Sequence, residues 1–444
     1  MVKLKSLNDI YGEEVVEDEA RVHGEKNVWS GEDDIDIENC NRRIRRQEEV
    51  ENKNEMDIHQ ETHGSHQTSR TGISGGKLND YLSELSEMMG ISSTSTSHSC
   101  EIPTSDMRIL NAHGAQVFAC AWSPSASFLA SGCLDSTIRI WTISNGTYRS
   151  SLQSEPPSNV LVLKHASELN DGPKHVPALD WNNDGTLLGT GSCDGKARIW
   201  STCGKLKSTL NKHTDAILKL KWNKNNTYIL TAGYDCAAIV WDVNSSKVKQ
   251  EFRYHSGSVS DVDWRDNDSF ATCSGDCMVH VCNIRTTYPI KKFSGHQEDV
   301  NCVKWDPTGS LLASCSDDKT VKEVYVIRWR PAGPGTNNSN QPSTLASASF
   351  DSTVKLWDVE NGKLLCSLNE HRDLVYGLAF SPNGEYLASG SADGSIHIWS
   401  LKEREIIKSY TGDSGVLGVC WNNEGDKVAA SLKDGTICIL NIRI

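Results

Sequence analysis

The chain has 444 residues, of which 37% are hydrophobic and 23% are charged, an ordinary balance for a globular protein. Its net charge of −13 argues against a protein that coats nucleic acid directly. No apolar run approaches the roughly 18 residues that a membrane span needs, and the N-terminus has no apolar signal-peptide core, so we expect neither a membrane protein nor a secreted one.

Residues 1–104 contain 22 Asp and Glu residues but only 11 Lys and Arg residues, whereas the remaining 340 residues are almost neutral. This acidic segment is poor in aromatic residues and lacks hydrophobic periodicity, so it buries too little apolar surface to offset its chain entropy. We expect residues 1–104 to be a largely disordered tail and residues 105–444 to be the folded domain. Within the tail, KLNDYLSELSEMMG (77–90) has leucines at helical spacing and predicts a short helix.

Four arginines gather in NRRIRRQ (41–47). One interpretation is a nuclear-import patch, because clustered cations suit an acidic receptor groove. The other is a solvated charge cluster balanced by nearby acids, and the sequence leaves both open.

From residue 105 onward one pattern returns eight times, mostly at intervals of 41 or 42 residues. The copies are LASGCLDSTIRIW (129–141), LGTGSCDGKARIW (188–200), ILTAGYDCAAIVW (229–241), FATCSGDCMVHVC (270–282), LASCSDDKTVKEV (312–324), LASASFDSTVKLW (345–357), LASGSADGSIHIW (387–399) and VAASLKDGTICIL (428–440). The interval is that of a four-stranded propeller blade, and helical periodicity is absent. We therefore predict an all-β propeller of seven to eight blades, with DMRIL (106–110) as the outer strand of the last one.

Four residue types recur at fixed offsets in these copies. The acids of the tight turns are Asp135, Asp194, Asp235, Asp276, Asp318, Asp351, Asp393 and Asp434. The hydroxyls four residues earlier are Ser131, Thr190, Thr231, Thr272, Ser314, Ser347 and Ser389. The strand-ending indoles are Trp141, Trp200, Trp241, Trp357 and Trp399. The histidines before the first strands are His113, His213, His255, His296 and His371, with none at that place in the second, sixth and eighth units.

Ser, His and Asp together invite a catalytic interpretation, but a hydrolase needs one such set and this chain repeats it once per unit. A structural network explains the spacing better. The turn carboxylate accepts from the His, the His bonds the Ser or Thr hydroxyl, and that hydroxyl meets the Trp indole, so that buried polar atoms find partners. We expect no catalytic residue, and the chain is predicted not to be an enzyme.

The His turns, the Ser/Thr–Asp pairs and the Trp-Asp endings (Trp241-Asp242 and Trp357-Asp358) resemble WD repeats. The repeats DPTGSLLASCSDD (306–318), TLASASFDSTVKLWD (344–358) and FSPNGEYLASGS (380–391) resemble those of the transducin-β-like corepressor subfamily, particularly the plant members that combine a LisH motif with WD repeats. The resemblance implies a nuclear scaffold in histone-deacetylase corepressor complexes that binds histone tails. It also implies a link to ubiquitin-ligase substrate recognition.

The sequence departs from this subfamily in two places. Residues 1–104 contain no recognisable LisH motif or F-box-like segment, which leaves self-association open. In the fifth unit only 11 residues separate Asp318 from Trp329, against 28 or 29 in most other units, and Val324 stands where Trp is expected. We therefore predict that the fifth blade lacks its outer strand and leaves an unpaired edge, with EVYVIRW (323–329) already serving the sixth blade.

Other chemistry finds little support in the sequence. Cys273, Cys277 and Cys282 cluster, but without zinc-site spacing, and the 15 scattered cysteines indicate reduced thiols in an intracellular protein. No phosphate loop or dinucleotide motif occurs, so we expect neither a metal nor a cofactor.

Protein partners are expected at the face formed by the tight turns around the channel mouth. We call the candidates there the channel-mouth residues: Phe118, Tyr234, Asp317, Tyr325, Phe350 and Tyr376. Our leading hypothesis is a non-catalytic nuclear scaffold for histone tails and corepressor subunits, without direct contact to nucleic acid or membrane. The alternative is a substrate receptor of a cullin–RING ubiquitin ligase, for which CNIR (282–285) and LNIR (440–443) are weak candidate adaptor motifs.

Overall fold

The computed structural model describes residues 2–6, 100–111, 113–143, 160–165, 174–318, 324–331 and 343–443. Within these ranges the chain forms eight β-sheets and one short 3-10 turn, η1 (Thr104–Asp106), which confirms the all-β prediction and sets the number of blades at eight. No helix in the described ranges is long and apolar enough to cross a membrane. The predicted helix at 77–90 and the arginine cluster at 41–47 lie outside them.

Six blades take four consecutive strands from one stretch of chain. Blade one has β3 (Val117–Trp122), β4 (Phe128–Cys133), β5 (Thr137–Thr142) and β6 (Val160–Lys164). Blade two has β7 (Ala178–Trp181), β8 (Leu187–Gly191), β9 (Lys196–Ser201) and β10 (Leu206–Asn211). Blade three has β11 (Ile217–Trp222), β12 (Tyr228–Gly233), β13 (Ala238–Asp242) and β14 (Lys247–Phe252). Blade four has β15 (Val259–Trp264), β16 (Ser269–Ser274), β17 (Val279–Asn283) and β18 (Lys291–Phe293). Blade six has β21 (Val324–Trp329), β22 (Thr344–Ser349), β23 (Val354–Asp358) and β24 (Lys363–Leu368). Blade seven has β25 (Val375–Phe380), β26 (Tyr386–Ser391), β27 (Ser395–Ser400) and β28 (Glu405–Thr411).

The other two blades each borrow a strand from the N-terminal side of the chain. Blade five has β19 (Val300–Trp305), β20 (Leu311–Ser316) and β1 (Val2–Ser6). Blade eight has β29 (Val416–Trp421), β30 (Lys427–Leu432), β31 (Thr436–Asn441) and β2 (Met107–Asn111).

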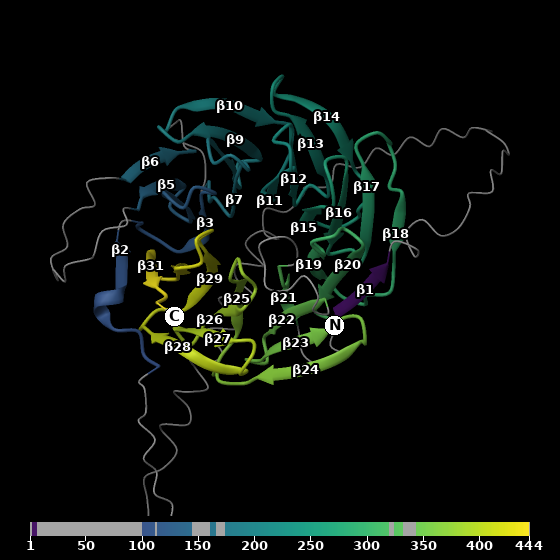
Figure 1. Cartoon of the computed structure of the whole chain (residues 1–444). Coiled ribbons are helices and arrows are strands. Elements are labelled where there is room, and N and C mark those ends of the chain that lie inside the picture. The colour runs from purple at the N-terminus through teal and green to yellow at the C-terminus, as the bar shows by residue number, and fades with distance from the viewer. Residues whose placement is uncertain are drawn as a thin grey trace, which may run out of the picture. The chain divides into compact units, whose positions relative to one another are not determined.

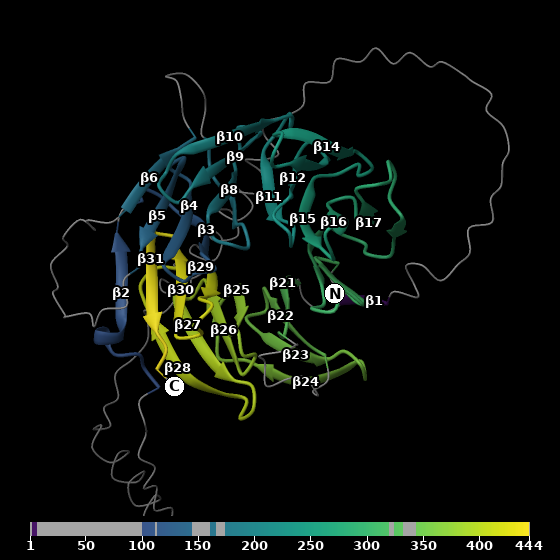
Figure 2. The ribbon, with the colours of Figure 1, turned by 45° about the horizontal axis from the view of Figure 1, so that its top comes forward.

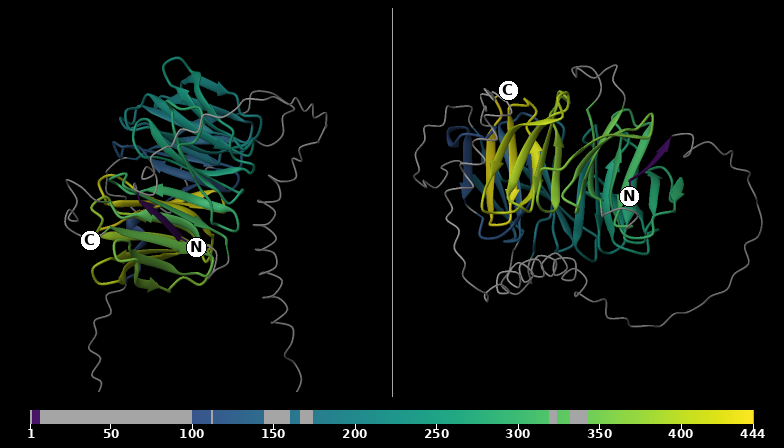
Figure 3. Two further views of the ribbon diagram at one scale, coloured as in Figure 1. Left: turned by 90° about the vertical axis from the view of Figure 1, so that its right-hand side faces the viewer. Right: turned by 90° about the horizontal axis from the view of Figure 1, so that it is seen from below.

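The eight sheets follow one another around a common axis (Figure 1). The first strand of each blade contacts the first strand of the next, and the series closes where β29 of blade eight meets β3 of blade one. Seen from the side, the sheets stand next to one another around the ring (Figure 3). Neighbouring sheets share apolar layers: Ile199 and Leu210 of blade two, for example, pack with Ile239 and Trp241 of blade three. The core therefore lies between the blades.

The turn aspartates explain the tight links between the second and third strands. The carboxylate of Asp393 accepts a hydrogen bond of 2.8 Å from the backbone N–H of Ser395, which is an Asx-type turn. Between these two residues Gly394 has a φ of +79°, and a Cβ added there would lie 2.2 Å from the carbonyl oxygen of Gly412. Glycine is required at this position because any side chain would add both strain and a clash.

Ring closure follows the prediction made from DMRIL (106–110). Strand β2 pairs with β31 in an antiparallel register that sets Leu110 opposite Ile437. In Figure 2 the blue β2 lies beside the yellow β31 at the outer edge of blade eight. Blade eight therefore has four strands, with β2 as its outer strand.

Blade five differs from the prediction. Among the described residues it has three strands, without the outer fourth one, and its third position is filled by β1, which pairs with β20 so that Lys3 faces Ser314 and Lys5 faces Leu312. Figures 1 and 3 show β1 in purple beside the green strands of this blade. Strand β21 (Val324–Trp329) belongs to blade six, as EVYVIRW predicts. The edge of β20 is therefore covered, because a distant segment supplies what the local sequence lacks.

The boundary of the folded part also differs from the expected position after residue 104. Residues Val2–Ser6 lie in blade five, and Glu101 bridges in parallel to Ser409 of β28, with Ile102 buried among blade-seven and blade-eight side chains. The expectation of a disordered tail for the stretch between these anchors stays a prediction, because residues 7–99 lie outside the described ranges.

Candidate functional site

Blade three contains the repeated polar network in full. His213 Nδ1 lies 2.8 Å from Asp235 Oδ1, and His213 Nε2 lies 2.8 Å from Thr231 Oγ1. Trp241 Nε1 donates to the same hydroxyl at 2.8 Å. Burial by itself raises the pKa of Asp235, but the contacts with His213, the Thr214 N–H and Arg253 outweigh it, so the pKa lies below its ordinary value. Asp235 is therefore ionised and hydrogen-bonded within the network of His213, Thr231 and Trp241.

The same contacts recur around the ring with small variations. His113, His255, His296 and His371 each lie 2.7 to 2.9 Å from the Ser or Thr of their own blade. The other indole donors to these hydroxyls are Trp141, Trp200, Trp357 and Trp399, at 2.8 to 3.0 Å. The hydroxyls that accept from these indoles are buried, at 0% exposure for Ser131, Thr231 and Ser389, so the network lies inside the blades.

Blade two has a histidine that the spacing rule misses. His165 Nε2 lies 2.8 Å from Thr190 Oγ1, and Arg198 bridges His165 and Asp194, with Arg198 Nη2 at 2.9 Å from an Asp194 oxygen. His165 is 1% exposed. As expected from the sequence, no histidine stands nine positions before Trp181, but His165 makes the same contact from a different offset. The residue lies 16 positions before Trp181 instead of nine, because extra residues separate it from β7.

A second hydroxyl, two residues before the turn acid in five of the eight units, was also missed. Ser192, Ser274, Ser316 and Ser391 each accept from the backbone N–H of the turn aspartate and donate to a carbonyl of the preceding link. The recurrence of serine at this offset was the signal available in the sequence. These serines tie the tight turn to the link between blades.

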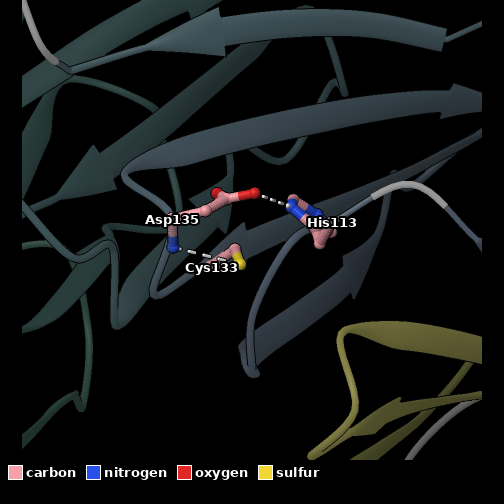
Figure 4. Close-up of side chains that lie close together, drawn as sticks. All are labelled: His113, Cys133 and Asp135. Atoms are coloured by element: carbon pink, nitrogen blue, oxygen red, sulfur yellow. Dashed lines mark hydrogen bonds and ion pairs between the residues drawn. The ribbon is translucent and has the colours of Figure 1, made fainter.

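His113, Cys133 and Asp135 in blade one bring three possible metal-binding atoms within 4.8 Å of one another (Figure 4). Burial raises the pKa of the Cys133 thiol to about 12, whereas a metal needs the thiolate. Cys133 Sγ donates to the Ala115 carbonyl at 3.0 Å and accepts from the Asp135 N–H at 3.3 Å, the two contacts that serine makes in other blades. The chemistry of this trio therefore fits a structural brace and does not fit a metal centre.

Three of the six channel-mouth residues form one group, which we call the aromatic cluster: Tyr325 of β21, Phe350 after β22 and Tyr376 of β25. The Tyr325 and Phe350 rings stack with centroids 5.4 Å apart, and Tyr376 meets them edge-on at 5.6 and 5.9 Å. Tyr325 and Phe350 are half-buried, and Tyr376 is 8% exposed. The cluster spans blades six and seven.

The remaining channel-mouth residues lie on other blades. Phe118 of blade one stacks on His175 with centroids 6.4 Å apart, and Tyr234 follows β12 in blade three. Asp317 of blade five bonds Asn301, and its N–H donates to the Asp299 carbonyl at 3.1 Å. Asp299 and Asp317 thus place two half-buried acidic residues in the blade that precedes the aromatic cluster.

The inner strands of blades four and five carry buried charge that the sequence analysis did not single out. Lys304 of β19 forms an ion pair with Asp261 of β15, which also accepts from the Val303 N–H at 3.2 Å. Burial favours the neutral form of both side chains, but the attraction between the two opposite charges outweighs this effect. The pKa of Asp261 therefore lies well below the ordinary value for Asp, and the pKa of Lys304 lies well above the ordinary value for Lys. A charged pair therefore joins two adjacent inner strands.

The family model described as WD domain, G-beta repeat matches eight segments of this chain. They are residues 104–142, 166–201, 204–242, 246–283, 287–322, 334–358, 362–400 and 404–441. The chain belongs to the WD-repeat family. The matches follow the eight blades, including the shortened fifth one.

Two relatives of this WD-repeat chain confirm the subfamily resemblance. WD40 repeat-containing protein HOS15 of Arabidopsis thaliana is 50% identical over 81% of this chain and 61% of its own length. F-box-like/WD repeat-containing protein TBL1X of Mus musculus is 47% identical over 77% of this chain and 68% of its own length. This chain therefore spans well under two thirds of the Arabidopsis relative. The solved C-terminal WD40 domain of Sif2 has a TM-score of 0.65 over 76% of this chain and 99% of that one, and at 23% identity it shows the fold alone.

Proposed function

We propose that this WD-repeat chain is a non-catalytic scaffold that holds other proteins at its channel mouth, as a nuclear component of a transcriptional corepressor complex with histone deacetylase and histone tails as partners. Its similarity to TBL1X and HOS15 supports this assignment. The repetition of the Ser, His and Asp sets and the burial of their hydroxyls, at 0% exposure for Ser131, Thr231 and Ser389, support a structural role for these sets.

The observation that carries the proposal is the aromatic cluster of blades six and seven, together with the half-buried acidic residues of blade five, the preceding blade. The faces of Tyr325 and Phe350 attract a cation by their ring quadrupoles, and Asp299 and Asp317 add a negative field. A lysine or arginine side chain of a basic peptide combines the charge and the apolar stem that such a surface binds. Histone tails are rich in both residue types.

Binding of synthetic peptides of the four core-histone N-terminal tails tests this site. We expect Tyr325→Ala and Phe350→Ala to weaken binding by about 3- to 30-fold, the range that loss of a partly desolvated cation–π contact gives. Asp317→Asn should lower the salt dependence of binding. Tyr288→Ala is the matched control, because Tyr288 is 63% exposed in blade four. Equal affinities for all four variants and the parent would refute the site.

Membership of a corepressor complex has its own test. Affinity purification of the tagged full chain from nuclear extract should recover a histone deacetylase, and recovery of neither a deacetylase nor a histone contradicts the assignment.

The ubiquitin-ligase alternative stays a prediction with a separate measurement. Arg285 and Arg443 of the two adaptor-like motifs are exposed and form ion pairs with Asp268 and Asp106. If these motifs bind a cullin adaptor, Arg285→Ala or Arg443→Ala abolishes adaptor recovery, whereas unchanged recovery removes the motifs as its binding site.

A further inference from the structure

Blade five carries a lysine where several other blades carry a tryptophan. In blade two, Trp200 of the third strand pairs with Leu188, and Arg198 pairs with the network residue Thr190. In blade five the corresponding pairs are Lys5 with Leu312 and Lys3 with Ser314. Lys5 of β1 therefore occupies the register position of the indole.

The indole has a double role in the blades that contain it. It donates to the network hydroxyl at 2.8 to 3.0 Å, and in blades one, two, three and seven it is at most 6% exposed, packed against the preceding blade. In blade five Ser314 Oγ lies 2.9 Å from His296 Nε2, but the structure gives it no indole partner among the described residues.

A cavity of about 20 Å³ lies at this place. Val279 and Phe293 of blade four line it on one side, and Lys5, Leu312 and Ser314 of blade five line it on the other. Phe293 is half-exposed, whereas Phe252, at the same register position of blade three, is 4% exposed. The space thus has the apolar walls and the polar corner of an indole pocket, part of which is taken by the flexible stem of Lys5.

Few side-chain contacts hold β1 in this position. Lys3 Nζ reaches the Gly295 carbonyl, and the Lys5 ammonium lies 5.4 Å from the centre of the Phe293 ring. Leu4 is 36% exposed. Long lysine side chains lose rotamer entropy when they are fixed, so β1 is a weaker occupant than a strand with a rigid aromatic ring.

We propose that the third-strand position of blade five is an acceptor site for an extended segment of a partner protein that carries tryptophan at the register position of Lys5. The segment replaces β1, pairs antiparallel with β20, fills the cavity with its indole and donates to Ser314. Strand addition supplies the main-chain hydrogen bonds, and the pocket selects the side chain. A second copy of this chain is the poorer occupant, because its β1 brings the same lysines.

The pocket is tested within the full chain by Lys5→Trp, with Lys5→Leu as the apolar control without an N–H donor. We expect Lys5→Trp to raise the unfolding midpoint by about 2 to 4 °C and to add blue-shifted tryptophan emission, with a smaller rise for Lys5→Leu. An unchanged or lower midpoint together with solvent-exposed emission overturns the pocket assignment.

The acceptor site is tested with a synthetic peptide of residues 352–359, STVKLWDV, which is the third strand of blade six in this chain. We expect it to bind the full chain at least tenfold more tightly than the same peptide with Ala in place of Trp. Lys5→Trp should abolish this binding, and Leu4→Pro should strengthen it by weakening β1. Equal binding of the two peptides overturns the proposal. The proposal is also overturned if the parent chain forms a dimer that Leu4→Pro dissociates, because β1 of a second copy then occupies the site.

Discussion

At the scale of the residue, the hydroxyl of Thr231 in β12 contacts Trp241 of the neighbouring strand β13. It also contacts His213, which lies in the connection between blades two and three. Thr231 is fully buried, so removal of its oxygen leaves an indole N–H and an imidazole nitrogen without a partner in a site that water does not reach. The cost of such unpaired atoms, and not the modest net gain of each bond, explains why the same residue types recur together in several blades.

We predict that Thr231→Val lowers the free energy of unfolding by about 2 to 3 kcal/mol at nearly constant volume. Thr209→Val on the exposed outer strand β10 is the control and should change it by no more than about 0.5 kcal/mol. Urea denaturation followed by tryptophan fluorescence measures both, and equal midpoints for the two variants would contradict the role of the hydroxyl.

Buried histidines make stability depend on pH. Burial, together with the neighbouring His371 ring at 4.5 Å, lowers the pKa of His397 to about 4 from 6.5. The unfolded chain therefore binds the proton first as pH falls, so the stability from this group is complete above pH 6.5 and is lost between pH 6.5 and 4. We expect the urea midpoint of the parent to fall over this range and His397→Gln to flatten that fall. Parallel pH profiles for the two proteins would rule the contribution out.

At the scale of the element, the two borrowed strands show where sequence reading succeeds and where it stops. Strand β2 was predictable, because DMRIL has strand-like residues directly before the first blade and the last blade had an open edge. Strand β1 was not predicted, because the alternation in VKLKS covers only five residues and no neighbouring strand or turn signal accompanies it. Its conformation is imposed by the edge of β20, some 300 residues away in sequence.

The closure strand offers a matched pair of variants. Leu110 is 3% exposed and packs with Trp141 and Ile437, whereas Ile109, next to it in β2, is 37% exposed. We expect Leu110→Ala to lower the free energy of unfolding by about 2 to 5 kcal/mol, as for other buried leucines, and Ile109→Ala to have a clearly smaller effect. Chemical denaturation distinguishes them, and the reverse order would show that β2 presents its other face to the ring.

At the scale of the whole molecule, the repeat period predicted the propeller, because a spacing that recurs eight times averages out the irregularities of any single blade. The repeat period did not predict features that depend on a single insertion or on the packing at a single place. His165 lies off the spacing because of the extra residues before β7, and the grouping of Tyr325, Phe350 and Tyr376 depends on how blades six and seven pack. The Asp261–Lys304 pair was missed because charge on an innermost strand contradicts the apolar pattern expected there.

Strand β1 has one further consequence for the molecule. Strand β1 ends at Ser6 in blade five, and the Cys100 carbonyl accepts a hydrogen bond from the Ser409 N–H of β28 in blade seven. Residues 7–99 are therefore a covalent tether with both ends attached to the ring. A covalently attached ligand acts at an effective concentration that is set by its connection and that protein dilution does not change. A protease site placed in this tether removes that advantage: after the cut we expect the unfolding temperature to fall as the protein is diluted, whereas the uncut chain shows no such dependence. A single backbone break between residues 6 and 100 would then vacate a site in blade five.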